Sequence, residues 1–406
     1  MTHIVIVGGG LAGGTAAETL RDEGFDGDVT IVAAEPHRPY QRPPLSKGYL
    51  AGSEGEDAVY LHDTDWYAAH GITLRAGVAA ASLDPDAHTL ALADGTELAY
   101  DRVLLATGAS PRQLSIPGHD LPGVHQLRTV DDAEALRERL RGGELRLVLI
   151  GSGWIGMEVA ATARDYGNEV TILERDPVPL AAAVGPRLGE MFRRLHEEHG
   201  VTVRTSVAVE AITGTERADG VVVDGRTVTA DLVLIGVGAV PNTALAEAAG
   251  LRVLNGILVD ASLRASAPDV FAAGDVANAF HPVLQRHLRS EHWANALAAG
   301  AVAAKAMLGM SAVHDGIPYF YTDQYDLGME LSGYPPLMAE AELVVRGDLD
   351  AREFIAFWVD DGRIVGGMNV NVWDVNDTVQ ALIRSGRRID SARLADPDVP
   401  LEGLAE

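Results

Sequence analysis

Six glycines and two glutamates carry the clearest chemical signal in this sequence. The glycines form two trios of equal spacing, Gly8, Gly10 and Gly13, and Gly151, Gly153 and Gly156. In a turn of this pattern the first glycine permits a tight bend, the second lets the backbone approach a pyrophosphate, and the third lets a helix pack against a strand. Each unit ends on an acid, Glu35 or Glu174, placed to bind ribose hydroxyls. The two trios therefore predict two dinucleotide-binding sites.

The elements around the two trios repeat in the same order. Residues 4–35 and 147–174 each contain an apolar run, the glycine turn, a small-residue helix and a second apolar run. This order places the N–H groups of the first helical turn beside a bound phosphate. A single GxGxxG is weak evidence, because a purely structural glycine turn has the same appearance. Two of them, each followed by an acid, strongly favour nucleotide binding.

Length, composition and charge restrict the class of protein. The chain has 406 residues, 47% of them hydrophobic, and a formal net charge of −26. The length predicts two or three globular α/β domains, and the charge argues against nucleic acid and anionic membrane as partners. No apolar run approaches about 18 residues without a charge, so we expect no transmembrane helix. The N-terminus enters a strand without a basic leader, which predicts a cytoplasmic protein.

The chain contains no cysteine. A disulfide framework, a thiolate metal site and a redox dithiol are therefore excluded, and no metal site is predicted. Any redox chemistry has to be carried by a bound cofactor alone.

Lys47 is one of two lysines in a chain with thirty arginines, and it follows Arg42-Pro-Pro in the segment RPPLSKGYL. Glu158 lies one turn into the expected helix WIGMEVAATA, whose other residues are small and apolar. A simple acid at a helix N-terminus is one interpretation of Glu158. That helix face should be buried, however, and a buried carboxylate needs a partner. Lys47 is the candidate, because an ammonium is more compact than the planar guanidinium of arginine.

Three further turns follow apolar strands. ATGASP (106–111) and IGVGAVPN (235–242) resemble turns by which a chain enters or leaves a nucleotide-binding domain. In FAAGDVA (271–277), Asp275 stands at a glycine turn, where a carboxylate accepts hydrogen bonds from polyol hydroxyls. Capping of a helix over VANAF is the alternative for Asp275.

From about residue 317 the pattern becomes that of a separate α+β domain. Asp361-Gly362 separates two β-rich runs within residues 353–372 and predicts a hairpin. VNDTVQALIRSG (375–386) predicts an amphipathic helix that ends at Gly386. Its inward residues are expected to be Val375, Val379, Leu382 and Ile383.

Two nucleotide folds in tandem, AAGD, and a strand-rich C-terminal domain resemble the flavoproteins with two dinucleotide-binding domains. Within this FAD-dependent pyridine nucleotide-disulfide oxidoreductase-like superfamily, the chain is similar to the oxygenase-coupled NADH:ferredoxin reductases, with rubredoxin reductases and apoptosis-inducing-factor-like proteins as relatives. The most specific segments are RPPLSK (42–47), LRTVDDA (127–133), GSGWIGMEVA (151–160), AAGDVA (272–277) and FYTDQYD (320–326).

The resemblance implies an α/β fold with two Rossmann-like domains and a C-terminal α+β domain. FAD would be held by a discontinuous domain of residues 1–111 and 239–316, NAD by residues 112–238, and residues 317–406 would form the third domain. The cofactor-binding residues implied are Gly8, Gly10, Ala12, Gly13, Glu35, Arg42, Lys47, Ala80, Thr107, Gly108, Arg128, Gly151, Gly153, Trp154, Ile155, Gly156, Glu158, Glu174, Gly238, Gly274, Asp275, Glu291, Trp293 and Tyr321.

The resemblance also implies roles for some of these residues. Lys47 and Glu158 would be the catalytic pair, with Lys47 donating to the N5/O4 edge of the flavin while Glu158 holds it and orients the nicotinamide carboxamide. Arg42 would contact the pyrophosphate, a solvated surface arginine being the alternative. Trp154 would shield the nicotinamide pocket, with helix–sheet packing as the alternative.

The implied activity is transfer of a hydride from NADH to FAD and of single electrons to a ferredoxin that supplies a haem or Rieske oxygenase. The missing cysteines exclude dithiol reductases and NADH peroxidases; a rubredoxin or quinone reductase and an NADH-sensing flavoprotein remain alternatives. Glu174 favours NADH over NADPH because it repels a 2′-phosphate, although Arg175 is placed to soften that repulsion.

The electron exit is expected at the C-terminal domain. The segment PYFYTDQYD would bring Gln324 and aromatic rings to the far side of the flavin. Tyr319 and Tyr321 replace tryptophans of the family, and packing is the alternative for these two tyrosines. An acidic ferredoxin would need a basic face on this acidic chain. The two candidate clusters are Arg286, His287 and Arg289, and Arg384, Arg387 and Arg388.

Overall fold

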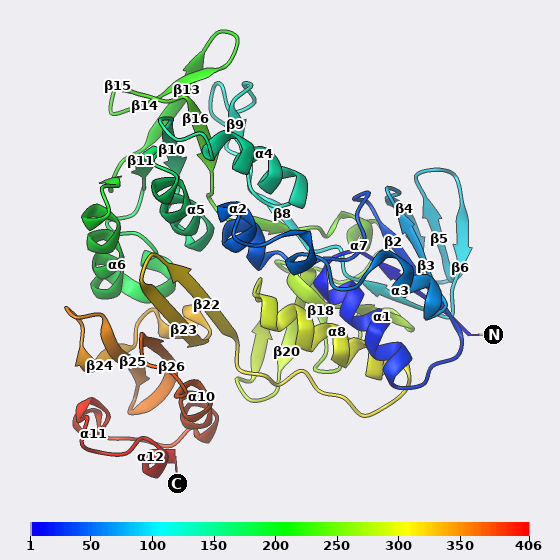
Figure 1. Cartoon of the computed structure of the whole chain (residues 1–406). Helices are drawn as coiled ribbons and strands as arrows, with labels where there is room; N and C mark the ends of the chain where they lie inside the picture. The colour runs from blue at the N-terminus through cyan, green and yellow to red at the C-terminus, as the bar shows by residue number, and fades with distance from the viewer. Residues whose placement is uncertain (1, 406) are drawn as a thin grey trace. The chain divides into compact units, whose positions relative to one another are not determined.

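The computed structural model describes residues 2–405 (Figure 1). It divides into two compact units. The first consists of the residues up to Pro43, Gly55–Ser110 and Ala239–Pro318. The second consists of Pro44–Glu54, Pro111–Gly238 and the residues from Tyr319 on. The short segment that carries Lys47 therefore belongs to the second unit.

The first unit is built on a parallel five-stranded sheet in the order β19-β7-β1-β2-β3. Its strands are β1 (His3–Val7), β2 (Asp28–Ala33), β3 (Ile72–Ala76), β7 (Arg102–Leu105) and β19 (Val270–Ala272). The apolar runs of β1, β2 and β7 are almost wholly buried, as strands of a covered parallel sheet should be. Helix α1 (Leu11–Asp22) packs beside α8 (Trp293–Met307) (Figure 1).

Smaller elements complete the first unit. Two three-stranded sheets consist of β4 (Ala80–Asp84), β5 (Thr89–Leu92) and β6 (Glu97–Ala99), and of β18 (Ile257–Val259), β20 (Ala277–His281) and β21 (Arg286–Leu288). Helices α3 (Thr64–Ala69) and α7 (Ala244–Ala248) are short. The strands β8 (Ala109–Pro111) and β17 (Ala239–Pro241) pair with each other where the chain passes between the units.

The second unit contains a second parallel sheet, in the order β12-β11-β10-β16-β9. Its strands are β9 (Val124–His125), β10 (Arg146–Ile150), β11 (Glu169–Leu173), β12 (Thr202–Arg204) and β16 (Leu232–Ile235). The four strands β12-β11-β10-β16 repeat the arrangement of β3-β2-β1-β7, so the near-repeat in sequence is a repeat in structure. Helices α4 (Val130–Leu140), α5 (Trp154–Asp165) and α6 (Ala181–Glu198) accompany this sheet, and β13 (Val209–Gly214), β14 (Ala218–Val223) and β15 (Arg226–Thr229) form a meander.

The C-terminal part of the second unit is an antiparallel sheet in the order β22-β23-β26-β25-β24. Its strands are β22 (Tyr319–Gln324), β23 (Leu327–Gly333), β24 (Glu342–Asp348), β25 (Glu353–Asp360) and β26 (Arg363–Val370). Short helices α9 (Pro335–Met338), α11 (Ser391–Ala395) and α12 (Glu402–Ala405) accompany it, together with α10 (Asn376–Ser385). Asp361 and Gly362 join β25 to β26 with φ of 47° and 75°, which confirms the predicted hairpin.

The predicted C-terminal helix is α10, and it ends at Gly386 in the left-handed conformation. Val379, Leu382 and Ile383 are buried as expected, whereas Val375 is half-buried because it precedes the first helical turn. The predicted fold class, two Rossmann-like α/β folds with a C-terminal α+β domain, is confirmed.

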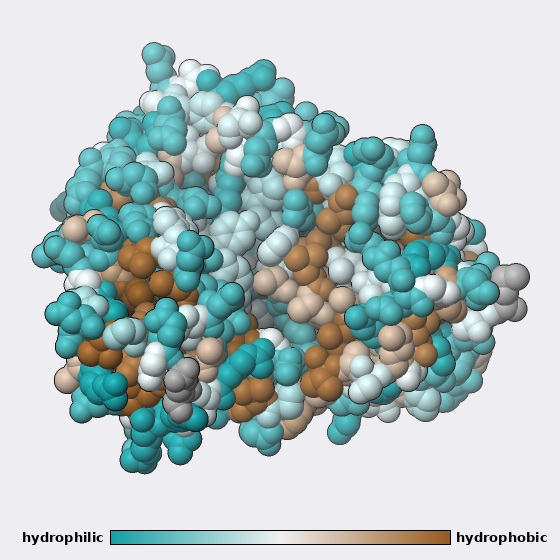
Figure 2. All heavy atoms as spheres, turned by 60° about the horizontal axis from the view of Figure 1, so that its bottom comes forward, coloured by the Kyte–Doolittle hydropathy of each residue, from teal (hydrophilic) through white to brown (hydrophobic). Residues whose placement is uncertain are grey.

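The face drawn in Figure 2 is dominated by hydrophilic side chains, in keeping with the net charge of −26. Hydrophobic side chains lie among them on this face. Within residues 2–405 no helix is both long and apolar enough to cross a membrane.

Candidate nucleotide-binding and redox sites

The first glycine turn joins β1 to α1 and is sterically closed at two of its three glycines. Gly8 has a φ of 130°, and a Cβ there would lie 2.0 Å from the carbonyl oxygen of Ala106. A Cβ at Gly13 would lie 2.1 Å from the carbonyl oxygen of Gly8. At Gly10, which precedes α1, a Cβ would meet no described atom within 4 Å. The open space lies where a phosphate binds at a helix N-terminus.

The second turn, between β10 and α5, has the same design. Gly151 has a φ of 98°, and a Cβ there would lie 2.5 Å from the carbonyl oxygen of Gly236. A Cβ at Gly156 would lie 2.8 Å from the carbonyl oxygen of Gly151. At Gly153 the nearest atom would be 4.0 Å away. Ile155, in the first turn of α5, is 44% exposed. A large apolar side chain left open at this place suits contact with a ligand.

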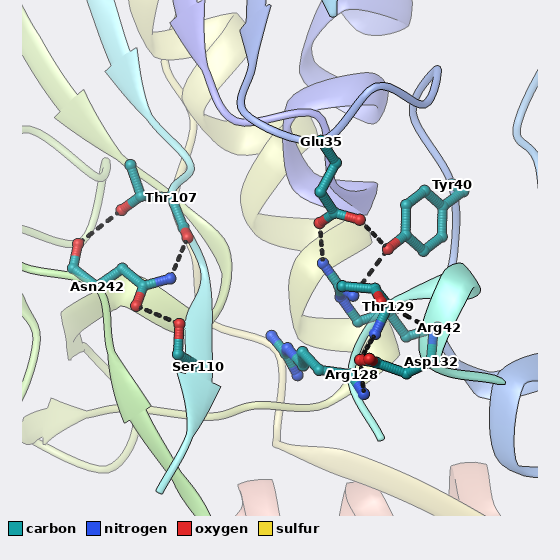
Figure 3. Close-up of polar contacts among 9 residues, drawn as sticks. All are labelled: Glu35, Tyr40, Arg42, Thr107, Ser110, Arg128, Thr129, Asp132 and Asn242. Carbon is teal, nitrogen blue, oxygen red and sulfur yellow. Dashed lines mark hydrogen bonds and ion pairs between the residues drawn. The ribbon is translucent and has the colours of Figure 1, made fainter. Parts of the chain in front are cut away.

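The acid that follows β2 is engaged by two residues of the next loop (Figure 3). Arg42 donates from Nη2 to Glu35 Oε1 over 3.1 Å, and Tyr40 donates its hydroxyl to Glu35 Oε2. Arg42 also donates from Nη1 to the Tyr40 hydroxyl oxygen over 3.0 Å. The sequence predicted Glu35 and Arg42 separately and missed their pairing and the buried Tyr40. The ion pair fixes both side chains beside the first nucleotide-binding turn.

The acid that follows β11 is bound by its own glycine turn. Glu174 Oε2 accepts hydrogen bonds from the backbone N–H of Ser152 over 2.8 Å and from its hydroxyl over 2.5 Å. Glu174 Oε1 accepts the backbone N–H of Asp176 over 2.7 Å. Arg175 is 86% exposed and pairs with Asp176 at 3.6 Å. The Arg175 guanidinium thus pairs with Asp176, and the softening of the Glu174 charge by Arg175 stays a prediction.

The two connecting turns predicted from ATGASP and IGVGAVPN contain a bonded cluster in the first unit (Figure 3). The Thr107 hydroxyl donates to the Asn242 carbonyl oxygen, and the Asn242 side-chain amide donates to the Thr107 carbonyl oxygen, both over 2.8 Å. Ser110 donates to Asn242 Oδ1 over 2.8 Å. Asn242 was not predicted, although its place directly after a proline-containing turn was a signal. Gly108 and Gly238 adopt positive φ of 67° and 97°.

Asp275 follows β19 in a single 3-10 turn, Gly274–Val276, and the chain then enters β20. The segment VANAF is thus a strand, and the alternative of helix capping by Asp275 is wrong. Gly274 has a φ of 76°, and a Cβ there would lie 3.0 Å from the Cβ of Ala12. This close approach of Gly274 to α1 brings Asp275 to the side of the first turn.

Trp293 begins α8 and donates from Nε1 to Gln41 Oε1 over 2.8 Å. Glu291, two residues earlier, forms an ion pair with Arg289. Ala80 begins β4. These three predicted cofactor residues lie in the first unit.

Lys47 and Glu158 form the predicted ion pair within the second unit, with Lys47 Nζ 2.6 Å from Glu158 Oε1. Lys47 follows the 3-10 turn Pro43–Ser46 and precedes α2 (Gly48–Ala51). Ser46 donates to Glu158 Oε2 over 2.5 Å, and Thr322 of β22 donates to Glu158 Oε1 over 2.6 Å. The Glu158 side chain is 3% exposed. Three donors thus compensate a buried carboxylate. Ser46 and Thr322 were not predicted.

Aromatic side chains of the second unit lie beside Lys47 and beside Trp154, which is on the same helix as Glu158. Trp154 lies 4.8 Å from the ring of Phe320 and 5.6 Å from the ring of Phe192, between centroids. Trp154 therefore makes packing contacts, as the alternative to a role in shielding the nicotinamide pocket expected. Tyr321 faces Lys47, with the ammonium 5.3 Å from its ring centroid. Burial, together with nearby carboxylates, raises the pKa of Tyr321, so its phenol stays neutral.

Arg128 leads into a capping box at the start of α4 (Figure 3). The Thr129 hydroxyl accepts the N–H of Asp132 over 3.1 Å, and Asp132 Oδ2 accepts the N–H of Thr129 over 2.8 Å and of Arg128 over 3.0 Å. The segment LRTVDDA is therefore also a helix-start signal. This interpretation of the segment was missed.

Gln324, expected on the far side of the flavin, has partners within the second unit, and its place relative to the flavin stays a prediction. Its side chain is buried and bonded at both ends, to His196 and to Thr322. Tyr319 donates its hydroxyl to Glu330 over 2.7 Å. Tyr319 is therefore bonded within the C-terminal sheet, whereas Gln324 joins that sheet to α6 of the nucleotide-binding part.

Each predicted basic cluster has at least one arginine in an ion pair. Arg286 and His287 are exposed, whereas Arg289 is 13% exposed and paired with Glu291. In the other cluster all three arginines are exposed, and Arg388 pairs with Asp361. The cationic surface of each cluster is therefore smaller than its sequence suggested.

These features fit two bound dinucleotides. Each turn excludes side chains where it packs on protein and leaves space at its middle glycine. In the first unit Glu35, Arg42 and Asp275 stand beside the turn, and in the second Trp154 and Glu158 lie on the helix that the turn begins. The donors and acceptors suit phosphate and ribose, and the helix N-termini suit anions.

Comparison with known proteins agrees with this geometry. Residues 2–300 match the family of pyridine nucleotide-disulphide oxidoreductases, and residues 319–405 match the reductase C-terminal family. The chain belongs to the pyridine nucleotide-disulphide oxidoreductases. It is an oxidoreductase of a family that uses FAD and NAD(H). The resemblance drawn from the sequence is thereby confirmed.

Relatives match the chain from end to end. A probable ferredoxin reductase of Castellaniella defragrans is 38% identical over 99% of this chain and 98% of its own length. The ferredoxin–NAD(+) reductase component of an anthranilate 1,2-dioxygenase system from Burkholderia cepacia is 39% identical over 98% of each chain. Among solved structures, the covalent putidaredoxin reductase–putidaredoxin complex matches with a TM-score of 0.95 and 34% identity, over 99% of this chain and 98% of that one.

Proposed function

We propose that this chain is an FAD-dependent NADH:ferredoxin reductase that supplies a haem or Rieske oxygenase with electrons through an iron–sulfur ferredoxin. The observation that carries the proposal is the presence of two dinucleotide-binding turns in a chain without cysteine. Electrons have no dithiol to pass through, so they must leave from the flavin itself. The relatives that match over the full length carry ferredoxin reductase names, which supports the same acceptor.

The residues of the first unit are proposed to hold FAD, and those of the second turn to hold the nicotinamide nucleotide. We keep residues 1–111 and 239–316 as the FAD domain, 112–238 as the NAD domain and 317–406 as the C-terminal domain. When bound, FAD accepts a hydride from NADH and releases electrons one at a time. The protein contributes position and electrostatics.

Lys47 and Glu158 are proposed as the catalytic pair. The carboxylate of Glu158 holds the Lys47 ammonium at 2.6 Å, so the positive charge has a fixed place at the head of α5. A fixed ammonium stabilises negative charge that develops beside it without reorganising during the reaction. Trp154, four residues before Glu158 on the same helix face, excludes water from the nicotinamide side.

Glu174 is proposed to select NADH. Its carboxylate is held beside the second turn by Ser152, where it repels a 2′-phosphate and accepts ribose hydroxyls. A cytoplasmic location, where NADH is available as donor, is part of the proposal.

The test is stopped-flow reduction of the FAD-loaded protein by NADH, followed by mixing with ferredoxins encoded near its gene. The proposal expects fast flavin reduction and fast reoxidation by one ferredoxin, with slow reoxidation by oxygen. Reoxidation only by a rubredoxin or a quinone would assign the acceptor to another class. A long-lived reduced complex that reacts slowly with every acceptor would indicate an NADH sensor and contradict the proposal.

A further inference from the structure

Strand β22 packs against α5 of the nucleotide-binding part of the same unit (Figure 1), and its Gln324 side chain is bonded to His196 of α6. Phe320, Thr322 and Gln324 alternate along the strand and share one face. Phe320 meets Trp154 of α5, Thr322 bonds Glu158 of α5, and Gln324 bonds His196 of α6. Strand β22 thus contacts both Trp154 and Glu158, the two candidate site residues on α5.

Four hydrogen bonds link these residues into one buried chain. Thr322 Oγ1 lies 2.6 Å from Glu158 Oε1, and Gln324 Nε2 lies 3.2 Å from Thr322 Oγ1. Gln324 Oε1 lies 2.9 Å from His196 Nε2, and His196 Nδ1 lies 3.4 Å from the Tyr325 hydroxyl. Thr322 and His196 are fully buried, and Gln324 is 1% exposed. The chain therefore has no competition from bulk water at its centre.

The hydrogen bonds in this series all run in the same direction, because the donor and acceptor chemistry of each group allows only one arrangement. A carboxylate only accepts, so Thr322 donates to Glu158 and its oxygen accepts from the amide NH₂ of Gln324. The carbonyl oxygen of Gln324 then accepts from Nε2–H of His196, whose Nδ1 accepts from Tyr325. Burial lowers the pKa of His196 to about 4, so the ring is neutral and supplies one donor and one acceptor. Every donor points towards Glu158.

We propose that Thr322 is a positioning residue for hydride transfer: supported by Gln324 and His196, it fixes the Glu158 carboxylate and through it the ammonium of Lys47. Aligned hydrogen bonds polarise one another and strengthen the bond at the charged end. Without the Thr322 hydroxyl, Glu158 Oε1 retains only its bond to the Lys47 ammonium. The carboxylate is then free to rotate while Oε2 stays bonded to Ser46. The proposal rests on the role of Lys47 given under the proposed function.

The environment of the Lys47 ammonium can be measured directly, because Lys47 and Lys305 are the only lysines in the protein sequence. Incorporation of lysine labelled with ¹³C at Cε and ¹⁵N at Nζ gives two side-chain NMR signals in the FAD-loaded protein. A Lys305→Arg variant assigns them. Lys305 pairs with Glu23 at 3.1 Å in the first unit and is 40% exposed, so its signal serves as an internal control.

Thr322→Val keeps the shape of the side chain and removes the donor. We expect the Lys47 signal to move and its ammonium protons to exchange with water faster, while the Lys305 signal stays in place. Reduction of the flavin by NADH should slow by about ten-fold, the scale of one lost hydrogen bond to a charged group. Thr322→Ser, which keeps the hydroxyl donor, should restore both the Lys47 signal and the rate of flavin reduction. Tyr325→Phe, at the weak end of the chain, should leave the Lys47 signal near its wild-type position.

An unmoved Lys47 signal in Thr322→Val, with unchanged proton exchange, would overturn the proposal. A moved Lys47 signal with unchanged flavin reduction would support the positioning and refute the proposed role of Lys47 in the reaction. If Thr322→Val does not fold, Gln324→Met replaces it, since it leaves Thr322 in place and removes only its support. A smaller displacement of the Lys47 signal in the same direction is then expected, and none would contradict the proposal.

Discussion

The two glycine turns are alike in their backbones and differ in what holds the acid that follows. Gly8 and Gly151 both stand where a side chain would overlap a carbonyl oxygen. Glu35, however, is bound by Arg42 and Tyr40 from the loop downstream, whereas Glu174 is bound by Ser152 inside its own turn. The backbone needed for a pyrophosphate is the same in both units, and the surroundings of the ribose-binding acid are set separately.

The helices that follow the two turns differ as well. Helix α1 is covered by α8, and small residues such as Ala12 and Gly300 allow the close packing. Helix α5 carries the buried Glu158 and is covered partly by β22, whose Phe320 contacts Trp154 and whose Thr322 makes a polar contact with Glu158. Under the proposed function, the apolar contact suits the unit that holds FAD, and the polar contact suits the unit that fixes the charges of Lys47 and Glu158.

The largest effect is expected from Gly8→Ala and Gly151→Ala. Each adds a Cβ within 2.0 to 2.5 Å of a carbonyl oxygen at a positive φ, so each should lower the free energy of unfolding by about 4 kcal/mol or more. Urea unfolding and the flavin content of the purified protein measure this. Gly24→Ala, with φ of 78° and no described atom within 4 Å of a Cβ, is the matched control and should cost only about 1 kcal/mol.

Acid should weaken the second unit through His196. The unfolded imidazole binds a proton near pH 6.5, while burial in the folded protein lowers the pKa of His196 to about 4. Stability is therefore lost as the pH falls from 6.5 to 4, by at most about 3 kcal/mol from this group. In His196→Gln the urea midpoint should fall less over this pH range than in the wild type. A His70→Gln control, at an exposed position, should follow the wild type; equal pH dependence in all three proteins would contradict the prediction.

Lys47→Met should slow reduction of the flavin by NADH about ten- to hundred-fold, because a preorganised charge is removed from the second site. Stopped-flow absorbance of the flavin measures the rate. Lys305→Met is the matched control in the first unit and should leave the rate unchanged. Flavin reduction at the wild-type rate in Lys47→Met would reduce the pair to a structural role.

The smallest effect is expected from the acids. Glu174→Gln should raise the ratio of kcat/KM for NADPH to that for NADH, by at most about ten-fold, because the repulsion of a 2′-phosphate is screened near the surface. Glu35→Gln should leave this ratio unchanged and weaken retention of FAD. If Glu35→Gln instead changed the preference between NADH and NADPH, the first turn would be the nicotinamide nucleotide site and the second turn the FAD site.

The sequence predicted the features that depend on local spacing. Both glycine turns, the hairpin at Asp361-Gly362 and the end of α10 at Gly386 follow from residue types with particular backbone needs. The pairing of Lys47 with Glu158 was predicted because a buried carboxylate needs a partner and because the flavoproteins that the sequence resembles pair these two positions. The turns and helix ends, by contrast, required no knowledge of distant contacts.

The remaining features depend on which distant side chains meet. Nothing in PYFYTDQYD distinguished Thr322, which bonds Glu158, from Gln324, which is turned towards His196. Serine and threonine occur throughout the chain, so Ser46 and Ser152 gave no signal of their own. VANAF was open to a helical interpretation until its pairing with β18 and β21 made it a strand. Tertiary contacts decided each of these cases.

The central claim is that the first turn holds FAD and the second holds the nicotinamide nucleotide, and Gly10→Ala and Gly153→Ala test it most directly. Both positions have negative φ, −87° and −72°, and room for a methyl group, so both variants should fold. Flavin content and titration with NAD⁺ should show that Gly10→Ala loses FAD, while Gly153→Ala keeps a full complement of FAD and binds NAD⁺ at least about ten-fold more weakly. Loss of FAD from Gly153→Ala with full retention in Gly10→Ala would contradict the account.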